Sequence, residues 1–291
     1  MDKLFNMNVS CEDDILEIFK DAKVRGKSVA VIGTGSHSNK SADVIISTRE
    51  MSHFEVKDET VVAQAGASLT KIREETSSMG LLLPTFYDGT MGGLLALNEA
   101  YPISTTYGTP YSFTDWVRVV TPVGVFRWKG LIGSKGKLGA FTEASIKLFP
   151  RPSKVITFTK AVNGQELLNL YEKIVDAKPI AFLIEYDGKY RIHVSLTEGN
   201  LLGMEYYEGV PLVEGSDKGS FMVETKDLSS FIKLVEATSP IYAYHILGVK
   251  WSKVYIGEEA ELEGWNYYPS NDVPPVVKKL KRVIDHLNVL V

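Results

Sequence analysis

Residues 83–98 read LPTFYDGTMGGLLALN, a proline-led turn followed by a Gly-Thr-Met-Gly-Gly core and a run of small and apolar residues. Because Gly92 and Gly93 lack a Cβ atom, their backbone N–H groups can approach an anion or a flat ring that a larger residue would hold away. A tight turn that opens a buried helix is the simpler interpretation of a lone Gly-Gly pair. The stretch therefore needs support from elsewhere in the chain before it indicates a ligand site.

Glycine-bearing loops occur at two other places in the first half of the chain. The apolar residues 28–32 predict a buried strand, which leads into GTGSHS at residues 33–38, where glycines and hydroxyls suit a phosphate group. A third loop, GSKGKLG, occupies residues 133–139. The G-x-G-x-x-G fingerprint of the Rossmann fold is not matched. Residues 33–38 alone fit a polar turn equally well, but three such loops in one lobe favour one long ligand lying across several turns.

The remaining patterns predict an α+β fold in two domains. Residues 150–152, Pro-Arg-Pro, predict a domain boundary, because two prolines at alternate positions disfavour a helix and interrupt a ladder. Asp187-Gly188 between two strand patterns predicts a β-hairpin in the second domain. We expect domains at residues 1–152 and 153–291, the second with an antiparallel sheet and helices on one face. The expected helices cover residues 10–26, 68–80, 165–177 and 228–237, with a last one beginning at Pro274-Pro275, and the expected strands cover 42–47, 60–65, 155–159, 180–186, 190–196, 219–224 and 241–249.

Composition excludes several classes of function. The 291 residues are 44% hydrophobic and 23% charged with a net charge of −4, which is ordinary for a globular protein and argues against nucleic acid as a partner. Cys11 is the single cysteine, so the chain alone cannot form an internal disulfide, a Cys-rich zinc site or an iron–sulfur cluster. No apolar run is long enough to span a membrane. We expect a cytoplasmic protein whose membrane association, if any, is through a partner.

The order of motifs along residues 29–152 resembles the FAD-binding oxidases and dehydrogenases of the vanillyl-alcohol oxidase type, also called PCMH-type. The resemblance rests on the three glycine loops, on TVVAQAGASLTKIREETSSMGLLLP at residues 60–84 and on YGTPYSFTDWVRVVTPVG at residues 107–124. Within that family the chain is most similar to the FAD-binding subunit of glycolate oxidase complexes. The resemblance implies a two-lobed FAD-binding domain followed by a smaller α+β cap domain.

The resemblance also implies which residues bind FAD. The first loop for the pyrophosphate would be Gly33, Thr34, Gly35, Ser36, His37 and Ser38. The second would be Thr90, Met91, Gly92 and Gly93, with Ala96 and Asn98 near the flavin. The adenosine and flavin side would contact Gly133, Ser134, Gly136, Leu138, Gly139 and Phe141. Asp115 matches an acidic residue that more often braces the fold than touches the cofactor.

Two details of the sequence bear on how the flavin would be held. Relatives with a covalent flavin attach it through a histidine, and the alignment puts Ser36 rather than His37 at that position, so FAD is expected to bind non-covalently. Relatives also carry roughly twenty more residues before the third loop, where this chain has only FRWKGL at residues 126–131. The flavin ring would then be more exposed, completed by a partner, or absent. Trp128 is a candidate wall for the ring, with local packing as the alternative.

The resemblance implies a partnership with a larger flavoprotein subunit and an iron–sulfur subunit that act on a 2-hydroxy acid such as glycolate or D-lactate. The metal-binding His motifs of larger subunits are missing, so no metal is expected. His193 and His245 lie in separate predicted strands and fit core or surface positions, with His245 a weak candidate for a catalytic base. Three hypotheses stay open: a subunit whose FAD relays electrons, a scaffold that has lost the cofactor, and a self-sufficient oxidase.

Overall fold

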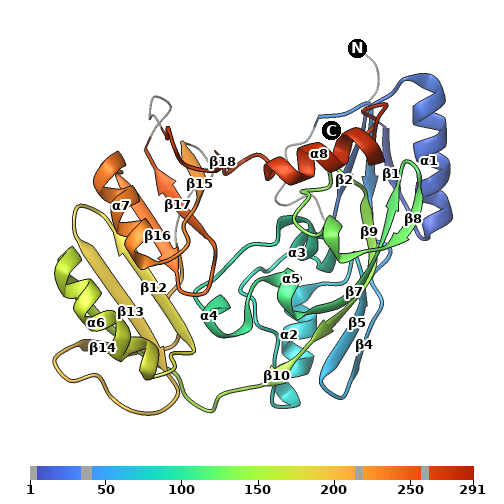
Figure 1. Ribbon diagram of the computed structural model, residues 1–291. Helices are drawn as coiled ribbons and strands as arrows, with labels where there is room; N and C mark the ends of the chain where they lie inside the picture. The colour runs from blue at the N-terminus through green and yellow to red at the C-terminus, as the bar shows by residue number, and fades with distance from the viewer. Residues whose placement is uncertain (1–4, 34–40, 214–218, 257–261) are drawn as a thin grey trace. The chain divides into compact units, whose positions relative to one another are not determined.

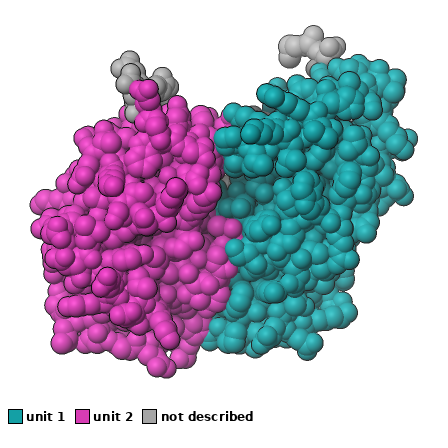
Figure 2. All heavy atoms as spheres, viewed as in Figure 1, with its two compact units in different colours: residues 1–99, 110–151, 274–291 teal, residues 100–109, 152–273 magenta. Residues whose placement is uncertain are grey.

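The computed structural model describes residues 5–33, 41–213, 219–256 and 262–291, which are shown as a ribbon in Figure 1. The chain divides into two compact units, coloured separately in Figure 2. Unit 1 comprises residues 1–99, 110–151 and 274–291, and unit 2 comprises residues 100–109 and 152–273. The boundary between residues 151 and 152 lies next to the division expected from the sequence, which stays a prediction; residues 100–109 and 274–291 group with units that their place in the chain does not suggest.

Long-range hydrogen bonds join each of these two segments to its unit. The C-terminal residues lie along the first sheet of unit 1, because the Val29 N–H donates to the Val289 carbonyl at 2.7 Å and the Val291 N–H donates to the Val29 carbonyl at 3.1 Å. Residues 100–109 lie against unit 2, where the Thr105 hydroxyl accepts from the Phe182 N–H at 2.9 Å. Local sequence patterns carry no signal for such pairings, so the prediction assigned both segments by their place in the chain.

Unit 1 begins with a three-stranded parallel sheet in the order β1-β3-β2, formed by β1 (Phe5–Asn8), β3 (Val44–Ser47) and β2 (Val29–Ile32). Helix α1 (Glu12–Arg25) buries Ile15, Ile18, Phe19 and Ala22 and ends at Gly26 in the left-handed conformation. The N-cap residue of α1 is Cys11. The Asp14 carboxylate accepts from the N–H groups of Ser10 at 2.9 Å and Cys11 at 3.2 Å.

The second sheet of unit 1 has five antiparallel strands in the order β4-β5-β9-β7-β8. Its strands are β4 (Phe54–Lys57), β5 (Thr60–Gln64), β9 (Ala140–Lys147), β7 (Thr114–Thr121) and β8 (Gly124–Arg127). The other elements of the unit are α2 (Leu69–Ser78), α3 (Met91–Leu97), α5 (Pro110–Phe113), the 3-10 helix η1 (Lys129–Leu131), α8 (Pro275–Ile284) and the short pair β6 (Leu81–Leu82) with β10 (Phe149–Pro150).

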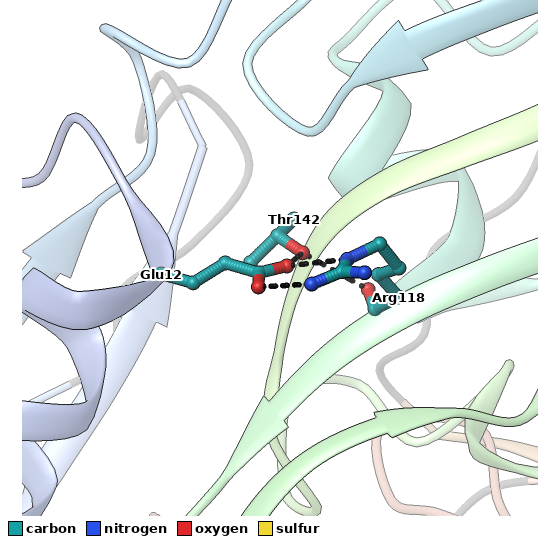
Figure 3. A network of polar contacts seen from close by, with 3 residues as sticks. All are labelled: Glu12, Arg118 and Thr142. Atoms are coloured by element: carbon teal, nitrogen blue, oxygen red, sulfur yellow. Dashed lines mark hydrogen bonds and ion pairs between the residues drawn. The ribbon is translucent and has the colours of Figure 1, made fainter.

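An ion pair ties helix α1 to this second sheet (Figure 3). The Arg118 guanidinium on β7 donates to both carboxylate oxygens of Glu12, at 2.8 and 2.5 Å, and the Thr142 hydroxyl on β9 donates to the same carboxylate at 2.6 Å. The hydrogen bond from Arg118 is the largest of the effects that hold the pKa of Glu12 below its usual value. Three elements from distant parts of the sequence therefore meet at one carboxylate.

Unit 2 is an eight-stranded antiparallel sheet in the order β14-β11-β13-β12-β16-β17-β15-β18. Its core includes Phe182 and Ile192 of the sheet together with Leu167 of α6 and Phe231 of α7. The hairpin around Asp187-Gly188 forms as predicted. The elements are α4 (Ser104–Tyr107), β11 (Ile156–Val162), α6 (Gly164–Asp176), β12 (Ala181–Tyr186), β13 (Tyr190–Leu196), β14 (Glu205–Glu208), β15 (Ser220–Glu224), α7 (Leu228–Thr238), β16 (Tyr242–Ile246), β17 (Trp251–Tyr255) and β18 (Tyr267–Pro269).

The α+β class and the antiparallel sheets expected from the sequence are thereby confirmed. Among the described residues, no helix is both long enough and apolar enough to cross a lipid bilayer.

Candidate cofactor site

The first two glycine loops meet at Gly33 and Thr90. Gly33 follows strand β2, and a Cβ atom at this position would lie 2.5 Å from the Thr90 Oγ1 atom. Only glycine fits such a close approach without displacing the threonine. The rest of the first loop, Thr34, Gly35, Ser36, His37 and Ser38, lies outside the described residues. The structure thus brings the start of the first loop to the start of the second.

The second loop is the N-terminal turn of α3, and its backbone donors are engaged within the protein. Thr90 caps the helix by accepting from the Gly93 N–H at 3.3 Å. The Met91 N–H donates to the Ala67 carbonyl at 3.0 Å, and the Gly92 N–H donates to the Ala65 carbonyl at 2.8 Å. The close approach expected of Gly92 is therefore made to the protein backbone, and a ligand would have to contact other atoms of this loop.

The third loop packs on the C-terminal end of the same helix. The Gly133 N–H donates to the Leu95 carbonyl at 2.9 Å, and the Lys135 N–H donates to the Ala96 carbonyl at 2.8 Å. Gly133, Lys135 and Gly136 have positive φ angles of 84°, 51° and 76°. This succession reverses the chain beside α3, so α3 is the element that joins the second and third loops.

The other predicted residues of the third loop divide into two groups. Leu138 and Phe141 are buried, and a Cβ atom at Gly139 would lie 2.5 Å from the Val120 carbonyl oxygen, so these three positions serve the packing of β9 on β7. Ser134 is also buried, but its hydroxyl has no hydrogen-bond partner among the described residues. A buried hydroxyl without a hydrogen-bond partner costs free energy, and a bound ligand at Ser134 would supply the missing hydrogen bond.

Asn98 closes α3 on the side of the third loop. It adopts the left-handed conformation with φ 52°, and its Oδ1 atom accepts from the Tyr111 N–H at 2.9 Å. A Cβ atom at Gly133 would lie 3.3 Å from the Asn98 Cβ atom. Asn98 therefore positions both the end of α3 and the beginning of the third loop.

Two residues that the sequence analysis missed hold the second loop in place. The Arg73 guanidinium on α2 donates to the carbonyl oxygens of Thr85 at 3.1 Å and Tyr87 at 2.9 Å. A Cβ atom at either Gly89 or Gly93 would lie 2.4 Å from the Tyr87 hydroxyl oxygen. Burial, followed by the charges of Glu99 and Asp88, raises the pKa of Tyr87 to about 12, so the phenol stays protonated. An aromatic residue two positions before a glycine loop is the signal that could have found it.

The two histidines of unit 2 take different positions. His245 is 5% exposed, stacks on Phe231 of α7 at 5.4 Å between ring centroids, and has its Nδ1 atom 3.0 Å from the Ser252 hydroxyl. Burial lowers the pKa of His245 to about 4. It occupies the core, which was the alternative to a catalytic role. The His193 Nε2 atom lies 2.8 Å from a Glu185 carboxylate oxygen on the neighbouring strand.

Asp115 and Trp128 make their contacts with residues outside the three glycine loops. Asp115 forms an ion pair with Lys147 across β7 and β9 at 3.3 Å, in keeping with a bracing role. Trp128 is 46% exposed, and its indole ring packs on Gly130, where an added Cβ atom would lie 2.6 Å from the ring. This is the local packing that was the alternative to a flavin wall. Within the described ranges, no group of three or more His, Cys, Asp or Glu side chains gathers in a way that could hold a metal.

The residues present fit a bound dinucleotide. Three loops converge on the short helix α3, glycine is required sterically at Gly33, and the buried Ser134 hydroxyl lacks a partner among the described residues. Gly33, Thr90 and Ser134 are the positions of this convergence that would contact FAD.

Comparison with known proteins supports FAD as the cofactor. Residues 7–129 match the FAD binding domain family. The glycolate oxidase subunit GlcE of Escherichia coli is 26% identical over 174 residues, which cover 53% of this chain and 50% of that protein. A D-lactate dehydrogenase of Anaerostipes hadrus is 25% identical over 215 residues, covering 64% of this chain and 43% of that protein. The chain spans about half the length of the curated relatives it matches.

Two solved structures of alkyldihydroxyacetonephosphate synthase share the fold. Their TM-scores are 0.61 and 0.62 at 15% and 14% sequence identity, and the superpositions cover 98% of this chain and 75% of theirs. The resemblance from which the cofactor was inferred is supported: residues 7–129 match an FAD-binding domain, and the chain is similar to the glycolate oxidase subunit GlcE.

Proposed function

We propose that this chain is the FAD-binding subunit of a cytoplasmic oxidoreductase complex that acts on a 2-hydroxy acid of the glycolate or D-lactate type. The observation that carries the proposal is the convergence of the three glycine loops on α3, with Gly33 held against Thr90. The names of the two curated relatives supply the substrate class. In this proposal a larger flavoprotein subunit and an iron–sulfur subunit complete the complex.

The chain's own residues would bind and orient the cofactor. Thr90 and Ser134 would offer hydroxyl groups, and the loop reversal at Gly133 and Gly136 would let a ligand approach the backbone without interposed side chains. FAD, when bound, accepts two electrons and passes them on singly or as a pair. His245 lies in the core at 5% exposure, so no base of this chain is assigned to the substrate. The proposed role is therefore electron relay, with FAD bound non-covalently.

A cofactor-free scaffold is the second candidate, and two observations favour it. The N–H groups of Met91 and Gly92 donate to protein carbonyls, so the second loop offers an anion fewer donors than its sequence predicts. The short connection at residues 126–131 acts in the same direction, because it removes chain that walls the flavin in relatives.

The flavin content of the purified protein separates the two candidates. The proposal expects a yellow protein with close to one FAD per chain, fully released by acid. A colourless protein that takes up no FAD on reconstitution would refute it in favour of the scaffold. Flavin that stays with the acid-precipitated protein would contradict non-covalent binding.

Substitution of Ser134 by alanine tests whether the buried hydroxyl faces the cofactor. Without FAD we expect the melting temperature to stay the same or rise, because the lost hydroxyl has no partner among the described residues. With FAD we expect the affinity to fall several-fold. An unchanged dissociation constant for FAD would remove Ser134 from the site.

A self-sufficient oxidase predicts a different result. Anaerobic addition of glycolate or D-lactate to this chain alone would then bleach the flavin absorbance. The relay proposal expects no bleaching until the larger subunit is added.

A further inference from the structure

Strand β8 and its flanking residues expose an unusual number of large apolar side chains. Val123, Val125, Phe126 and Trp128 are 47%, 39%, 40% and 46% exposed, and Tyr111 nearby is 48% exposed. We call these five residues the β8 surface. Val125 and Phe126 are adjacent in a strand, so both faces of β8 present an apolar side chain to solvent.

β8 is also an end strand of its sheet. In the described part of the chain, no strand pairs with β8 on the side away from β7. An exposed apolar edge strand is a template for pairing with another chain, and proteins usually protect such edges with charges. The opposite edge of the same sheet has this protection: β4 exposes Glu55 and Lys57, which form an ion pair with each other at 2.9 Å. β8 exposes a single charge, Arg127, beside the apolar Val125 and Phe126, so its edge is less protected than that of β4 and is open to pairing.

The charges around the β8 surface specify the kind of partner. Residues 116–142 contain five basic residues and no acidic one, although the whole chain carries a net charge of −4. One of the five, Arg118, is neutralised by its ion pair with Glu12 of helix α1. Arg127 lies over the Trp116 ring at 4.6 Å, and Lys129 lies over the Tyr111 ring at 4.9 Å. Apolar side chains within a basic surround are complementary to an apolar segment flanked by acidic residues.

A second copy of this chain fits this surface poorly. Pairing two β8 strands would bring the basic residues 127 and 129 of both copies to one interface, with no acidic residue of the same stretch to compensate. A different protein with acidic residues at its own strand edge avoids this repulsion and extends the sheet by one strand.

We propose that the β8 surface is where the larger flavoprotein subunit docks, by adding an extended, acid-flanked apolar segment to the edge of β8. This inference rests on the proposed function, because it locates the surface used by the partner assigned there.

The test compares two double variants of the full chain, each tagged and purified from the native organism. Phe126→Ser with Trp128→Ser removes the two aromatics of the β8 surface. Leu202→Ser with Ile241→Ser is the matched control, because these residues are 90% and 79% exposed in unit 2. Mass spectrometry identifies and quantifies a larger flavoprotein per chain, while FAD content and melting temperature report on folding.

We expect the β8 variant to lose about tenfold or more of the co-purifying flavoprotein, with FAD content and melting temperature unchanged. The control should keep the wild-type amount. Association of the wild-type subunits should also slow as ionic strength rises, since opposite charges steer it.

Three results would overturn the inference, and they can be told apart. Equal recovery of the flavoprotein with both variants would refute the β8 surface and leave the proposed function intact. Absence of any larger flavoprotein from the wild-type preparation, even after chemical cross-linking in cells, would refute both. A dimer of the isolated chain that light scattering detects and the β8 variant dissociates would assign the surface to a second copy instead.

Discussion

The contact between Gly33 and Thr90 can be measured by a double-mutant cycle. In Gly33→Ala, the new Cβ atom would lie 2.5 Å from Thr90 Oγ1, so the hydroxyl must move away. That hydroxyl caps α3 by accepting from the Gly93 N–H, and loss of such a cap costs about 1 kcal/mol. We expect Gly33→Ala to lower the free energy of unfolding by about 1 to 2 kcal/mol, including the steric displacement.

The same substitution should cost much less once Thr90 is alanine. Apart from Oγ1, the nearest atoms are Thr90 Cγ2 at 3.3 Å, which Thr90→Ala also removes, and Thr90 Cβ at 3.5 Å, an ordinary contact. The cycle therefore predicts a coupling energy of about 1 kcal/mol between the two positions.

Urea unfolding of the four proteins, monitored by circular dichroism without added FAD, measures that coupling. Effects that add within about 0.3 kcal/mol would mean that the two loops do not touch. Since their meeting is the observation behind the proposed function, such additivity would remove its structural basis. FAD binding by the same four proteins then shows whether the contact matters to the ligand.

Three further predictions concern other parts of the molecule. Gly92→Ala should destabilise the cofactor-free protein by about 1 to 2 kcal/mol in urea titrations, because its Cβ atom would lie 3.1 Å from the Ala65 carbonyl oxygen. Gly164→Ala is the control: its Cβ atom would meet nothing closer than 3.6 Å, so the substitution should be neutral or slightly stabilising. Glu12→Gln should lower the free energy of unfolding by about 1 kcal/mol at neutral pH, a modest value because water screens the ion pair with Arg118. Folding lowers the pKa of Glu12, so the stability that the carboxylate contributes is present above its unfolded pKa and is lost as pH falls through its folded pKa. The melting temperatures of wild type and variant should therefore converge in acid. Burial lowers the pKa of His245 from 6.5 to about 4, so between these pH values the unfolded chain binds a proton that the folded chain does not. The free energy of unfolding should therefore fall as pH drops from 6.5 to 4. His245→Gln should flatten that slope, and an unchanged slope would contradict the burial of the imidazole.

The elements with strong local signals are predicted well from the sequence. Helix α2 lies within the expected range 68–80, where Ser68 caps it by accepting from the Lys71 N–H at 3.5 Å, and Asp187-Gly188 forms the turn between β12 and β13. Pro275 begins α8 in the place expected of a first-turn proline. In each case a few neighbouring residues determine the conformation, so the local sequence is enough to predict it.

The site itself could be predicted only in part, because its contacts join distant residues. The glycine loops were recognisable, but the Arg73 guanidinium that holds the second loop acts on carbonyl oxygens 12 and 14 residues away. Strand β4, with two exposed charges among its four residues, gives a weak pattern, and the sequence analysis did not assign it. Sheet partners and backbone pairings of this range depend on the assembled fold, which no local pattern specifies.

The structure also changes what the Gly-Gly pair at residues 92 and 93 explains. The sequence suggests that glycine is needed so that N–H groups reach a ligand, yet the Gly92 N–H reaches the Ala65 carbonyl at 2.8 Å. Glycine at position 92 lets α3 approach the segment after β5, and glycine at position 93 leaves room for the Tyr87 hydroxyl. Because α3 carries the second loop at one end and the third at the other, this packing is what makes the loops converge. The two glycines therefore determine where the helix lies, and the effect of replacing them should be measurable before any cofactor is added.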